Sequence, residues 1–486
     1  MKKNKSEGLN RKQKLDHLIS LKINPFPSKS EKKYTILESS GMLEKNVITA
    51  GRISSIRSHG KSMFMDLTDN TGKIQIYFKY DEIGENNYKL LRFVDSGDIL
   101  QVKGVVFKTL AGEMTIKVQK YSILCKALLP IPDKWYGLKD VETRYRKRYV
   151  DMLINEKARR NFKIRSDIVS NLRKFMLDND FIEVETPILQ AIPGGAAARP
   201  FITHYNILKQ DMYLRIAPEL YLKRMIIGGF EKVFEIGKSF RNEGLSHMHN
   251  PEFTMMEFYW AYQDYKGLME FTQKLIPEVI KKTIGKLEVE YQGDIINFKP
   301  PYRTISFKDL IYENCKIDIY RYDDFDSLEK KIKEEGIKID FRDIKVWAKL
   351  VDELYKKVAR PKIVEPIFLI DHPIELTPLA KAHEDNPQIA QRFQLVCGKG
   401  IELVNAYTEL NNPIEQDERF KEQVKMSKQG WDESAMMDSD FIEALKYGLP
   451  PTAGWGMGIE RMAMLLTDQH SIKEVIPFPT LRNKNE

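Results

Sequence analysis

Residues 233–262, VFEIGKSFRNEGLSHMHNPEFTMMEFYWAY, contain the pattern that decides the fold. Both ends of this segment alternate apolar and polar side chains, and a stretch with Gly244 and Pro251 separates them. We therefore expect two β-strands around a loop. Because side chains alternate along a strand, Arg241 and Glu243 are expected on one face of the first strand.

The neighbouring sequence adds helices and strands in an irregular order. Apolar residues at helical spacing predict a helix over residues 161–178, and period-two alternation predicts a strand over 181–187. Charged helical stretches follow at 331–335 and 347–357. Without a regular strand–helix–strand rhythm, this mixture favours an α+β body built on an antiparallel sheet flanked by helices.

The first third of the chain has a different pattern. Five short alternating segments between residues 46 and 127, separated by turn signals, predict a small closed β-barrel. The 486 residues suggest about three structural units. We place a basic extension at residues 1–45, the barrel at 46–130, a basic linker at 131–150 and the α+β body at 151–486.

Charge is divided unevenly between these parts, although the net charge is only +8. Residues 1–150 contain 29 Lys and Arg against 16 Asp and Glu, a balance of +13. The remainder contains 48 against 53, a balance of −5. Binding of a polyanion by the first part and a solvated lysine-rich surface are equally compatible with this excess.

Composition also bears on the compartment. No apolar run approaches the roughly 18 residues of a transmembrane helix, and no secretory signal is expected from the basic N-terminus. The three cysteines, Cys125, Cys315 and Cys397, are far apart and odd in number. They fit a reducing compartment, so we expect a cytoplasmic protein that does not bind membranes.

Two arginines are candidates for anion binding. Arg241 lies in the first strand expected in the opening segment, and Arg461 lies in GMGIERMAML, residues 456–465. A planar guanidinium forms paired bonds with phosphate or carboxylate, and two such groups suit a triphosphate. The glycines at 454, 456 and 458 match a dinucleotide fingerprint only loosely, because the third is one position early.

These segments, in this order, resemble the three motifs of the class II aminoacyl-tRNA synthetases. The barrel and basic linker match the subclass that handles lysine, aspartate and asparagine. The resemblance covers about residues 45–482. FIEVETPIL (181–189) resembles motif 1, which builds the dimer interface; FRNEG and HNPEFTMMEFY (240–259) resemble motif 2; GWGMGIERMAML (454–465) resembles motif 3; and residues 193–206, 212–224 and 405–412 resemble lysyl-tRNA synthetases.

The resemblance implies a homodimeric lysine–tRNA ligase with an OB-fold barrel and a class II catalytic domain. Such an enzyme activates L-lysine with ATP to lysyl-adenylate and pyrophosphate. It then transfers the lysyl group to the 3′ end of tRNA(Lys) and releases AMP. No covalent enzyme intermediate is required, and no serine or cysteine nucleophile is evident in the sequence.

A lysine pocket needs carboxylates, because a buried unpaired ammonium is costly, whereas an aspartate pocket needs cations. The resemblance assigns Glu257, Glu409 and Tyr259 to the ε-ammonium. Ornithine is harder to reject than neutral residues, since one methylene is worth about 1–3 kcal/mol. The other lysine contacts implied are Glu219 and Gly195 for the α-amino group, and Asn405 and Arg241 for the α-carboxylate.

For ATP, the resemblance implies that Arg241 contacts the α-phosphate and Arg461 the γ-phosphate, which makes these two the catalytic residues. Phe253 is expected to stack on adenine. Mg²⁺ is expected near Glu402 and Glu409, and because it keeps several waters no dense ligand cluster is needed. The remaining ATP residues implied are Glu243, His249 and Asn250.

Two positions depart from the family pattern. Met248 stands where bacterial relatives often have arginine, so the γ-phosphate contact is weaker or supplied elsewhere. Gln394 stands where the family usually has a magnesium-binding glutamate, and the segment from there to Glu402 is one residue longer. Because Gln394 offers only a neutral oxygen, the number of bound metal ions stays open.

The barrel is expected to bind the tRNA anticodon through a basic groove and aromatic stacking. By resemblance, Phe64 stacks on a base, while Arg57 and Gln75 contact the central uridine. The alternative for Phe64 is a place in the barrel core.

Three other functions fit the sequence less well. A non-catalytic nucleic-acid-binding protein is disfavoured by the motif residues, including Glu257 and Arg461. An enzyme that lysylates a protein is disfavoured by the barrel, which the truncated relatives with that activity lack. An aspartyl or asparaginyl relative is disfavoured by the acidic pocket.

Overall fold

The computed structural model describes residues 9–132, 138, 140–196, 198–342, 344–428 and 437–483, without the side chains of 425–428. The chain divides into two compact units, Met1–Asp140 and Val141–Glu486. Within the described ranges, no helix has the length and apolar character needed to cross a bilayer.

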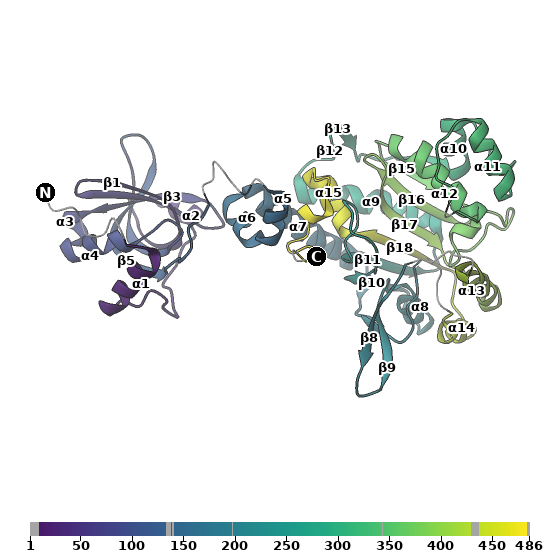
Figure 1. Ribbon diagram of the computed structural model, residues 1–486, viewed down its shortest axis with the longest axis horizontal. Coiled ribbons are helices and arrows are strands. Elements are labelled where there is room, and N and C mark those ends of the chain that lie inside the picture. Colours follow the sequence, from purple (N-terminus) through teal and green to yellow (C-terminus); the bar gives the residue numbers. More distant parts are fainter. Residues whose placement is uncertain are drawn as a thin grey trace. The chain divides into compact units, whose positions relative to one another are not determined.

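The first unit is a closed barrel in the strand order β1-β2-β3-β5-β4, which confirms the predicted five-stranded barrel (Figure 1). Alternation turns one side of each strand inward, and Met65, Ile76 and Val102 are fully buried there. The elements of this unit are α1 (Arg11–Ser20), α2 (Ile36–Ser40), β1 (Asn46–His59), β2 (Ser62–Thr68), β3 (Lys73–Lys79), α3 (Tyr80–Ile83), α4 (Glu85–Leu90), η1 (Leu91–Phe93), β4 (Ile99–Lys108) and β5 (Met114–Cys125).

The predicted basic extension is part of this unit from residue 9 onward. Leu18 of α1 and Ile36 of α2 are buried in the barrel core. The Arg11 guanidinium donates to the backbone oxygens of Ser96 and Ala127 at 2.8 and 3.1 Å. Residues 1–8 of the predicted extension lie outside the described residues. The boundary drawn at residue 45 therefore separates elements that fold together.

The second unit is built on an eight-stranded sheet in the order β14-β15-β16-β17-β18-β11-β10-β6. Its pairings are antiparallel except for β14 with β15 and β10 with β6. The unit also contains a three-stranded sheet, β7-β9-β8, and a two-stranded sheet, β12-β13. The strands of the second unit are β6 (Ile182–Glu183), β7 (Leu189–Gln190), β8 (Phe201–Tyr205), β9 (Gln210–Leu214), β10 (Lys232–Phe240), β11 (Glu252–Ala261), β12 (Glu288–Tyr291), β13 (Asp294–Asn297), β14 (Arg303–Ser306), β15 (Ile367–Ile370), β16 (Arg392–Cys397), β17 (Ile401–Thr408) and β18 (Thr452–Gly458).

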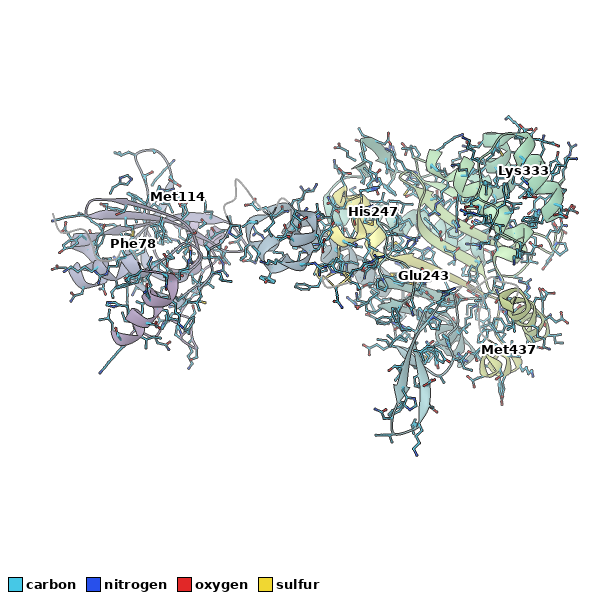
Figure 2. The ribbon with its side chains drawn as sticks, in the orientation of Figure 1. Phe78, Met114, Glu243, His247, Lys333 and Met437 are labelled. Atoms are coloured by element: carbon cyan, nitrogen blue, oxygen red, sulfur yellow. The ribbon has the colours of Figure 1, made fainter. Side chains whose placement is uncertain are left out.

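The helices of this unit are α5 (Val141–Arg146), α6 (Arg148–Ile154), α7 (Glu156–Asp178), α8 (Glu219–Ile227), α9 (Tyr265–Ile284), α10 (Phe307–Cys315), α11 (Phe325–Glu334), α12 (Trp347–Val358), η2 (Arg360–Lys362), η3 (Ile374–Leu376), α13 (Pro413–Lys428), α14 (Ser439–Lys446), α15 (Ile459–Thr467) and η4 (Ile472–Glu474). The predicted helices at 161–178, 331–335 and 347–357 correspond to α7, α11 and α12. Figure 2 labels Lys333 on the outer helix α11 and Phe78 in the barrel.

The opening segment forms the antiparallel pair β10–β11, as predicted. Two local expectations were wrong. β10 ends at Phe240, so Arg241 and Glu243 lie beyond the strand and share no strand face. The strand expected over 181–187 is only the two-residue β6, parallel to β10, and the chain after it is irregular.

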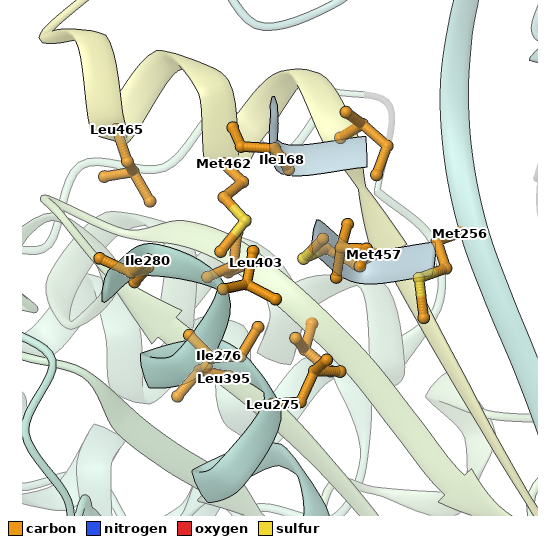
Figure 3. Close-up of a cluster of buried hydrophobic side chains, with 14 of the residues drawn as sticks. Ile168, Met256, Leu275, Ile276, Ile280, Leu395, Leu403, Met457, Met462 and Leu465 are labelled. Carbon is orange, nitrogen blue, oxygen red and sulfur yellow. The ribbon is translucent and has the colours of Figure 1, made fainter. Parts of the chain in front are cut away.

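The core of the second unit lies where α7, α9 and α15 pack against the sheet. Figure 3 shows Ile168 of α7, Ile276 of α9 and Met462 of α15 facing Leu395 and Met457 of the strands. These apolar side chains belong to one continuous buried cluster, so the sheet is fixed from the side of these helices.

The sheet separates this core from a cavity through simple alternation. On β11, Phe258 enters the core and Glu257 lines the cavity. On β18, Trp455 is buried, and its indole nitrogen donates to Thr272 Oγ1 at 3.0 Å. Gly454 and Gly456, one residue to either side, line the cavity. The motif GWGMG therefore alternates core side chains with positions that leave the cavity open.

The basic segment at 141–150, predicted as part of a linker, belongs to the second unit. Arg148 is fully buried and donates to Asp151 at 2.8 Å and to the backbone oxygen of Lys473 at 2.6 Å. Arg144 pairs with Glu474 at 2.9 Å. Residues 133–137 and 139 of the predicted linker lie outside the described residues. These two arginines therefore form internal ion pairs, so their charge is not part of the excess that could bind a polyanion.

A buried charge cluster in the barrel unit generates a stability prediction. Lys126 Nζ is fully buried and lies 2.8 Å from Asp98 and 2.5 Å from Asp95. Lys126→Met leaves these carboxylates without their cation, so we expect the free energy of unfolding to fall by about 3 kcal/mol. Chemical denaturation followed by circular dichroism measures this free energy. Lys120→Met, at an exposed position of β5, is the control, and an equal effect of both substitutions would contradict the prediction.

Candidate active site and anticodon-binding surface

The second unit contains a cavity of about 390 Å³ on the side of the sheet opposite the core. Its walls come from β11, β17 and β18, the start of α8, the start of α15 and the segment between β10 and β11. Every residue predicted for lysine or ATP lines this cavity except Glu409. Residues far apart in the sequence are thus brought to one place.

One end of the cavity is acidic. Glu219 begins α8, and Glu257 and Tyr259 project from β11. Gly195, with φ +86°, passes so close that a Cβ there would lie 2.8 Å from Cβ of Glu219. A Cβ at Gly454 would lie 2.1 Å from Oε1 of Glu409. Only glycine fits at these two positions, because any side chain would displace a pocket carboxylate.

The electrostatics of this end favour an entering cation. Burial raises the pKa of Glu257 to about 8, and the nearby carboxylate of Glu219 adds to the rise. The Tyr259 hydroxyl donates to Glu257 Oε2 at 3.3 Å, and burial raises the pKa of Tyr259 well above its ordinary value. At pH 7 the carboxyl of Glu257 is therefore mostly protonated, and a neighbouring ammonium would favour its ionised form.

Two further residues at this end were not predicted. The Lys223 ammonium lies 2.7 Å from Glu219 Oε1 and also contacts Glu409 Oε2. The Tyr407 hydroxyl donates to Glu219 Oε1 at 2.6 Å. Glu409 lies behind the cavity wall rather than on it. The only sequence signal for Lys223 was its spacing of four residues from Glu219 on one helix.

The other end of the cavity is basic. The guanidinium carbon of Arg241 lies 5.2 Å from the centre of the Phe253 ring. Arg461 is half-buried in the first turn of α15, and its Nη1 donates to the backbone oxygen of Glu402 at 2.7 Å. The neighbouring Glu460 accepts from Arg165 of α7 at 2.8 Å. This contact fixes the start of α15, and hence Arg461, against α7.

His249 lies among these cations. Burial lowers its pKa, and Arg461, Arg241 and Arg360 lower it further. The imidazole is therefore neutral at pH 7 and adds no charge of its own. Arg360, which the sequence analysis did not single out, donates through Nε to the backbone oxygen of Gly400 at 2.7 Å. It places a further cation near His249, the residue that follows Met248.

The remaining motif 2 residues have different environments. The amide of Asn250 is engaged at both ends, since Nδ2 donates to the Glu252 oxygen at 2.6 Å and Oδ1 accepts from Thr480 at 3.3 Å. Glu243 is exposed at the cavity rim, and Figure 2 shows it in the same part of the unit as His247. Met248 packs against the apolar core.

Asn405 of β17 lines the cavity between its two ends. Its Oδ1 accepts from Arg392 Nε at 2.8 Å, so its amide nitrogen is the end available to an acidic ligand group. Arg392 also lines the cavity and was not predicted. It is anchored by a second donation to Thr377 Oγ1 at 2.8 Å.

The structure does not bring together the two carboxylates predicted to hold Mg²⁺. Glu402 and Glu409 are seven residues apart along β17, which corresponds to roughly 20 Å. Because Mg²⁺ ligands bind at about 2 Å, a single ion cannot be held by both carboxylates, so metal binding by Glu409 stays a prediction that requires a second ion. Glu409 is paired with Lys223. Glu402 lines the cavity beside Arg461 and fits Mg²⁺ that is also held by phosphate oxygens.

Gln394 does not add a ligand to Glu402. Its Oε1 lies 3.2 Å from Nε2 of the buried His372. Burial holds the pKa of His372 well below its ordinary value, so this imidazole is neutral. The register of β16 and β17 shifts between Leu395 and Val396, in the segment that the sequence showed to be one residue longer.

The barrel unit places the three predicted anticodon residues on adjacent strands. Arg57 of β1 is the register partner of Phe64 of β2, and Gln75 lies on β3. Phe64 is partly exposed and lies outside the barrel core. Its ring stacks on the ring of Tyr77, with the ring centres 4.7 Å apart. A core position, the alternative for Phe64, does not fit this placement.

Arg57 and Gln75 are each held by an acidic residue that was not predicted. Arg57 pairs with Asp66 at 3.0 Å, and Gln75 Nε2 donates to Glu113 at 2.9 Å. Both polar side chains are therefore oriented before any RNA binds.

Comparison with known proteins agrees with this geometry. Residues 140–482 match the family described as tRNA synthetases class II (D, K and N), and residues 47–124 match the OB-fold nucleic acid binding domain. The lysine–tRNA ligase of Thermotoga maritima is 46% identical over 485 residues, 98% of this chain and 95% of that protein.

Two further relatives carry the same name. The lysine–tRNA ligase of Carboxydothermus hydrogenoformans is 46% identical, with 98% of each chain covered. That of Aquifex aeolicus is 49% identical over 90% of this chain and 73% of its own length. The chain therefore belongs to the lysine–tRNA ligase family of the class II tRNA synthetases.

Proposed function

We propose that this protein is a lysine–tRNA ligase that activates L-lysine with ATP and transfers the lysyl group to the 3′ end of tRNA(Lys). The observation that carries the proposal is a single cavity with opposite charges at its ends. Glu219 and Glu257 lie at one end, and Arg241 and Arg461 at the other. A diamino acid and a nucleoside triphosphate would each find complementary charge there.

The pocket orients lysine through its three charged groups. Glu257 and Tyr259 receive the ε-ammonium, with Glu409 behind them, and Glu219 receives the α-ammonium. The amide nitrogen of Asn405 and the guanidinium of Arg241 hold the α-carboxylate. A neutral amino acid would leave the buried carboxylates unpaired, which excludes it more strongly than a difference of size.

In the first step, a lysine carboxylate oxygen attacks the α-phosphorus of ATP, and pyrophosphate leaves toward Arg461. Arg241 touches both reacting groups and stabilises the charge that develops on the phosphorus oxygens. In the second step, a hydroxyl of the terminal tRNA adenosine attacks the acyl carbon, and AMP leaves. Orientation and fixed charges supply the rate, since no group of the protein forms a covalent intermediate.

Glu402 would hold Mg²⁺ together with ATP phosphates, and a bound ion would neutralise phosphate charge. Phe253 presents a ring for the adenine, and the neutral His249 can donate to a phosphate oxygen.

The barrel is proposed to bind the anticodon of tRNA(Lys). Phe64 offers an aromatic face for a base, and Arg57 and Gln75 supply polar contacts from neighbouring strands. Residues 1–140, which form the barrel unit, contain 25 Lys and Arg against 15 Asp and Glu, and this balance of +10 supports binding of a polyanion.

A homodimer and a cytoplasmic location complete the proposal. Apolar side chains near motif 1 are exposed on the single chain, and a face of this kind fits burial against a second copy. They are Ile182, Ile188 and Leu189, with Ile202, Ile207 and Leu208 of the β8–β9 hairpin. The free thiols of Cys125, Cys315 and Cys397 fit a reducing compartment.

Replacement of Arg241 tests the first step. Arg241→Ala should reduce lysine-dependent ATP–pyrophosphate exchange by about 10²–10³-fold, because it removes a donor aimed at the developing charge. Arg303→Ala, which breaks an exposed ion pair with Glu313, is the control. Near-normal exchange by the Arg241 variant would remove this residue from the mechanism.

The pKa of Glu257 predicts that lysine binding is linked to proton release. Below a pKa of about 8, the free pocket binds a proton that the substrate ammonium must expel. We expect KM for lysine to fall as pH rises from 6 to 8, by up to about tenfold per pH unit. Titration calorimetry at pH 7 in buffers of different ionisation enthalpy measures the released proton. Glu257→Gln should abolish this linkage. Uptake of a proton when lysine binds to the wild-type protein would contradict the prediction.

Replacement of Phe64 separates the two units functionally. Phe64→Ala should weaken tRNA binding by about 1–3 kcal/mol, seen as a higher KM for tRNA in charging, because it removes a stacking face. Pyrophosphate exchange, which needs no tRNA, should stay unchanged. Phe26→Ala, at an exposed position of the same unit, is the matched control. Equal charging by both variants would argue against an anticodon role for Phe64.

A further inference from the structure

A buried ammonium of the protein itself lies beside the lysine pocket. Lys223, on α8, has no exposed surface, and its Nζ contacts Glu219 at 2.7 Å and also Glu409. The rings of Tyr407 and Phe441 flank the ammonium, with centres 5.8 and 5.7 Å away. Lys223 is therefore enclosed by carboxylates and aromatic faces, as a bound cationic ligand would be.

The position of this residue is not explained by stability alone. A buried ion cluster can often be replaced by apolar residues without loss of stability, so its presence is weak evidence of a stabilising role. The neighbouring Arg224 pairs with Asp438 and Asp440 instead of the pocket carboxylates. By contrast, one partner of Lys223 lines the cavity and the other lies directly behind Gly454.

We propose that Lys223 is a positioning residue that fixes the carboxylates of Glu219 and Glu409 and thereby sets the length of the lysine pocket. The inference rests on the proposed lysine specificity. Glu219 comes from α8 and Glu409 from the end of β17, and the Lys223 ammonium joins the two.

The physical reason is the repulsion between like charges in a buried space. Glu219, Glu257 and Glu409 are all buried, and the Lys223 ammonium compensates two of them. Without this ammonium, the carboxylates of Glu219 and Glu409 would separate or rotate away from each other. A displacement of about 1 Å at a binding group can cost about 10²-fold in rate, and ornithine differs from lysine by a single methylene.

Lys223→Met tests this role in the full-length chain. In pyrophosphate exchange we expect KM for lysine to rise roughly tenfold or more, with KM for ATP unchanged. The preference for lysine over ornithine in kcat/KM should also fall roughly tenfold. Lys126→Met, which removes a comparably buried lysine from the barrel unit, is the matched control and should change neither value.

A purely structural role gives a different result. In that case Lys223→Met lowers the melting temperature and the fraction of active sites, while KM and the lysine-to-ornithine preference of the remaining sites stay at the wild-type values. That result would overturn the proposal. Lys223→Arg keeps the charge and should recover part of the lysine affinity, whereas Lys223→Ala should recover it when ethylammonium is added.

If Lys223→Met does not fold, Lys223→Gln is the second variant, because its amide can still donate a hydrogen bond to one of the carboxylates without carrying the positive charge. This variant should still have lost the lysine-to-ornithine preference, and a wild-type preference in it would equally overturn the proposal. Pyrophosphate exchange by the wild-type protein distinguishes failure of the proposed function from failure of the positioning role. Absence of lysine-dependent exchange in the wild type refutes the proposed function, whereas normal exchange with an unaltered Lys223→Met variant refutes only the positioning role.

Discussion

Repulsion among buried carboxylates is the constraint on which this active site depends. Glu219, Glu257 and Glu409 come from a helix and two strands that meet at one end of a cavity. Protonation of Glu257 lowers the charge at this end, whereas the carboxylates of Glu219 and Glu409 would drive their supporting elements apart unless packing and counter-charge opposed them. The sheet supplies the packing, because its far side is held by α7, α9 and α15, and Lys223 supplies the counter-charge.

The same sheet gives the two ends of the cavity their opposite chemistry. Alternation along β11 and β18 sends aromatic and apolar side chains into the core, while carboxylates and glycines face the substrate side. Rigid strands fix the carboxylates, and the arginines come from strand and helix ends, where the backbone turns toward the cavity. A site built in this way holds fixed charges before any substrate enters, which is the condition for electrostatic catalysis.

Much of this arrangement was predictable from the sequence, because it depends on local periodicity. The β10–β11 pair, the barrel and the helix α7 follow from alternation and helical spacing. What could not be predicted depends on contacts between distant segments. Lys223 with Glu409 and Arg148 with the chain near Pro477 are pairs of this kind, and neither leaves a local pattern.

The contacts of Arg148 also order events during synthesis. The first helices of the second unit lie in residues 141–154. Hydrogen bonds from Arg144 and Arg148 join them to residues 473–477. The barrel has all of its strands once Cys125 has been made, whereas the catalytic unit lacks part of its own N-terminal packing until residues 473–477 have been made. During translation, the RNA-binding unit can therefore be folded while the unit that consumes ATP is still incomplete.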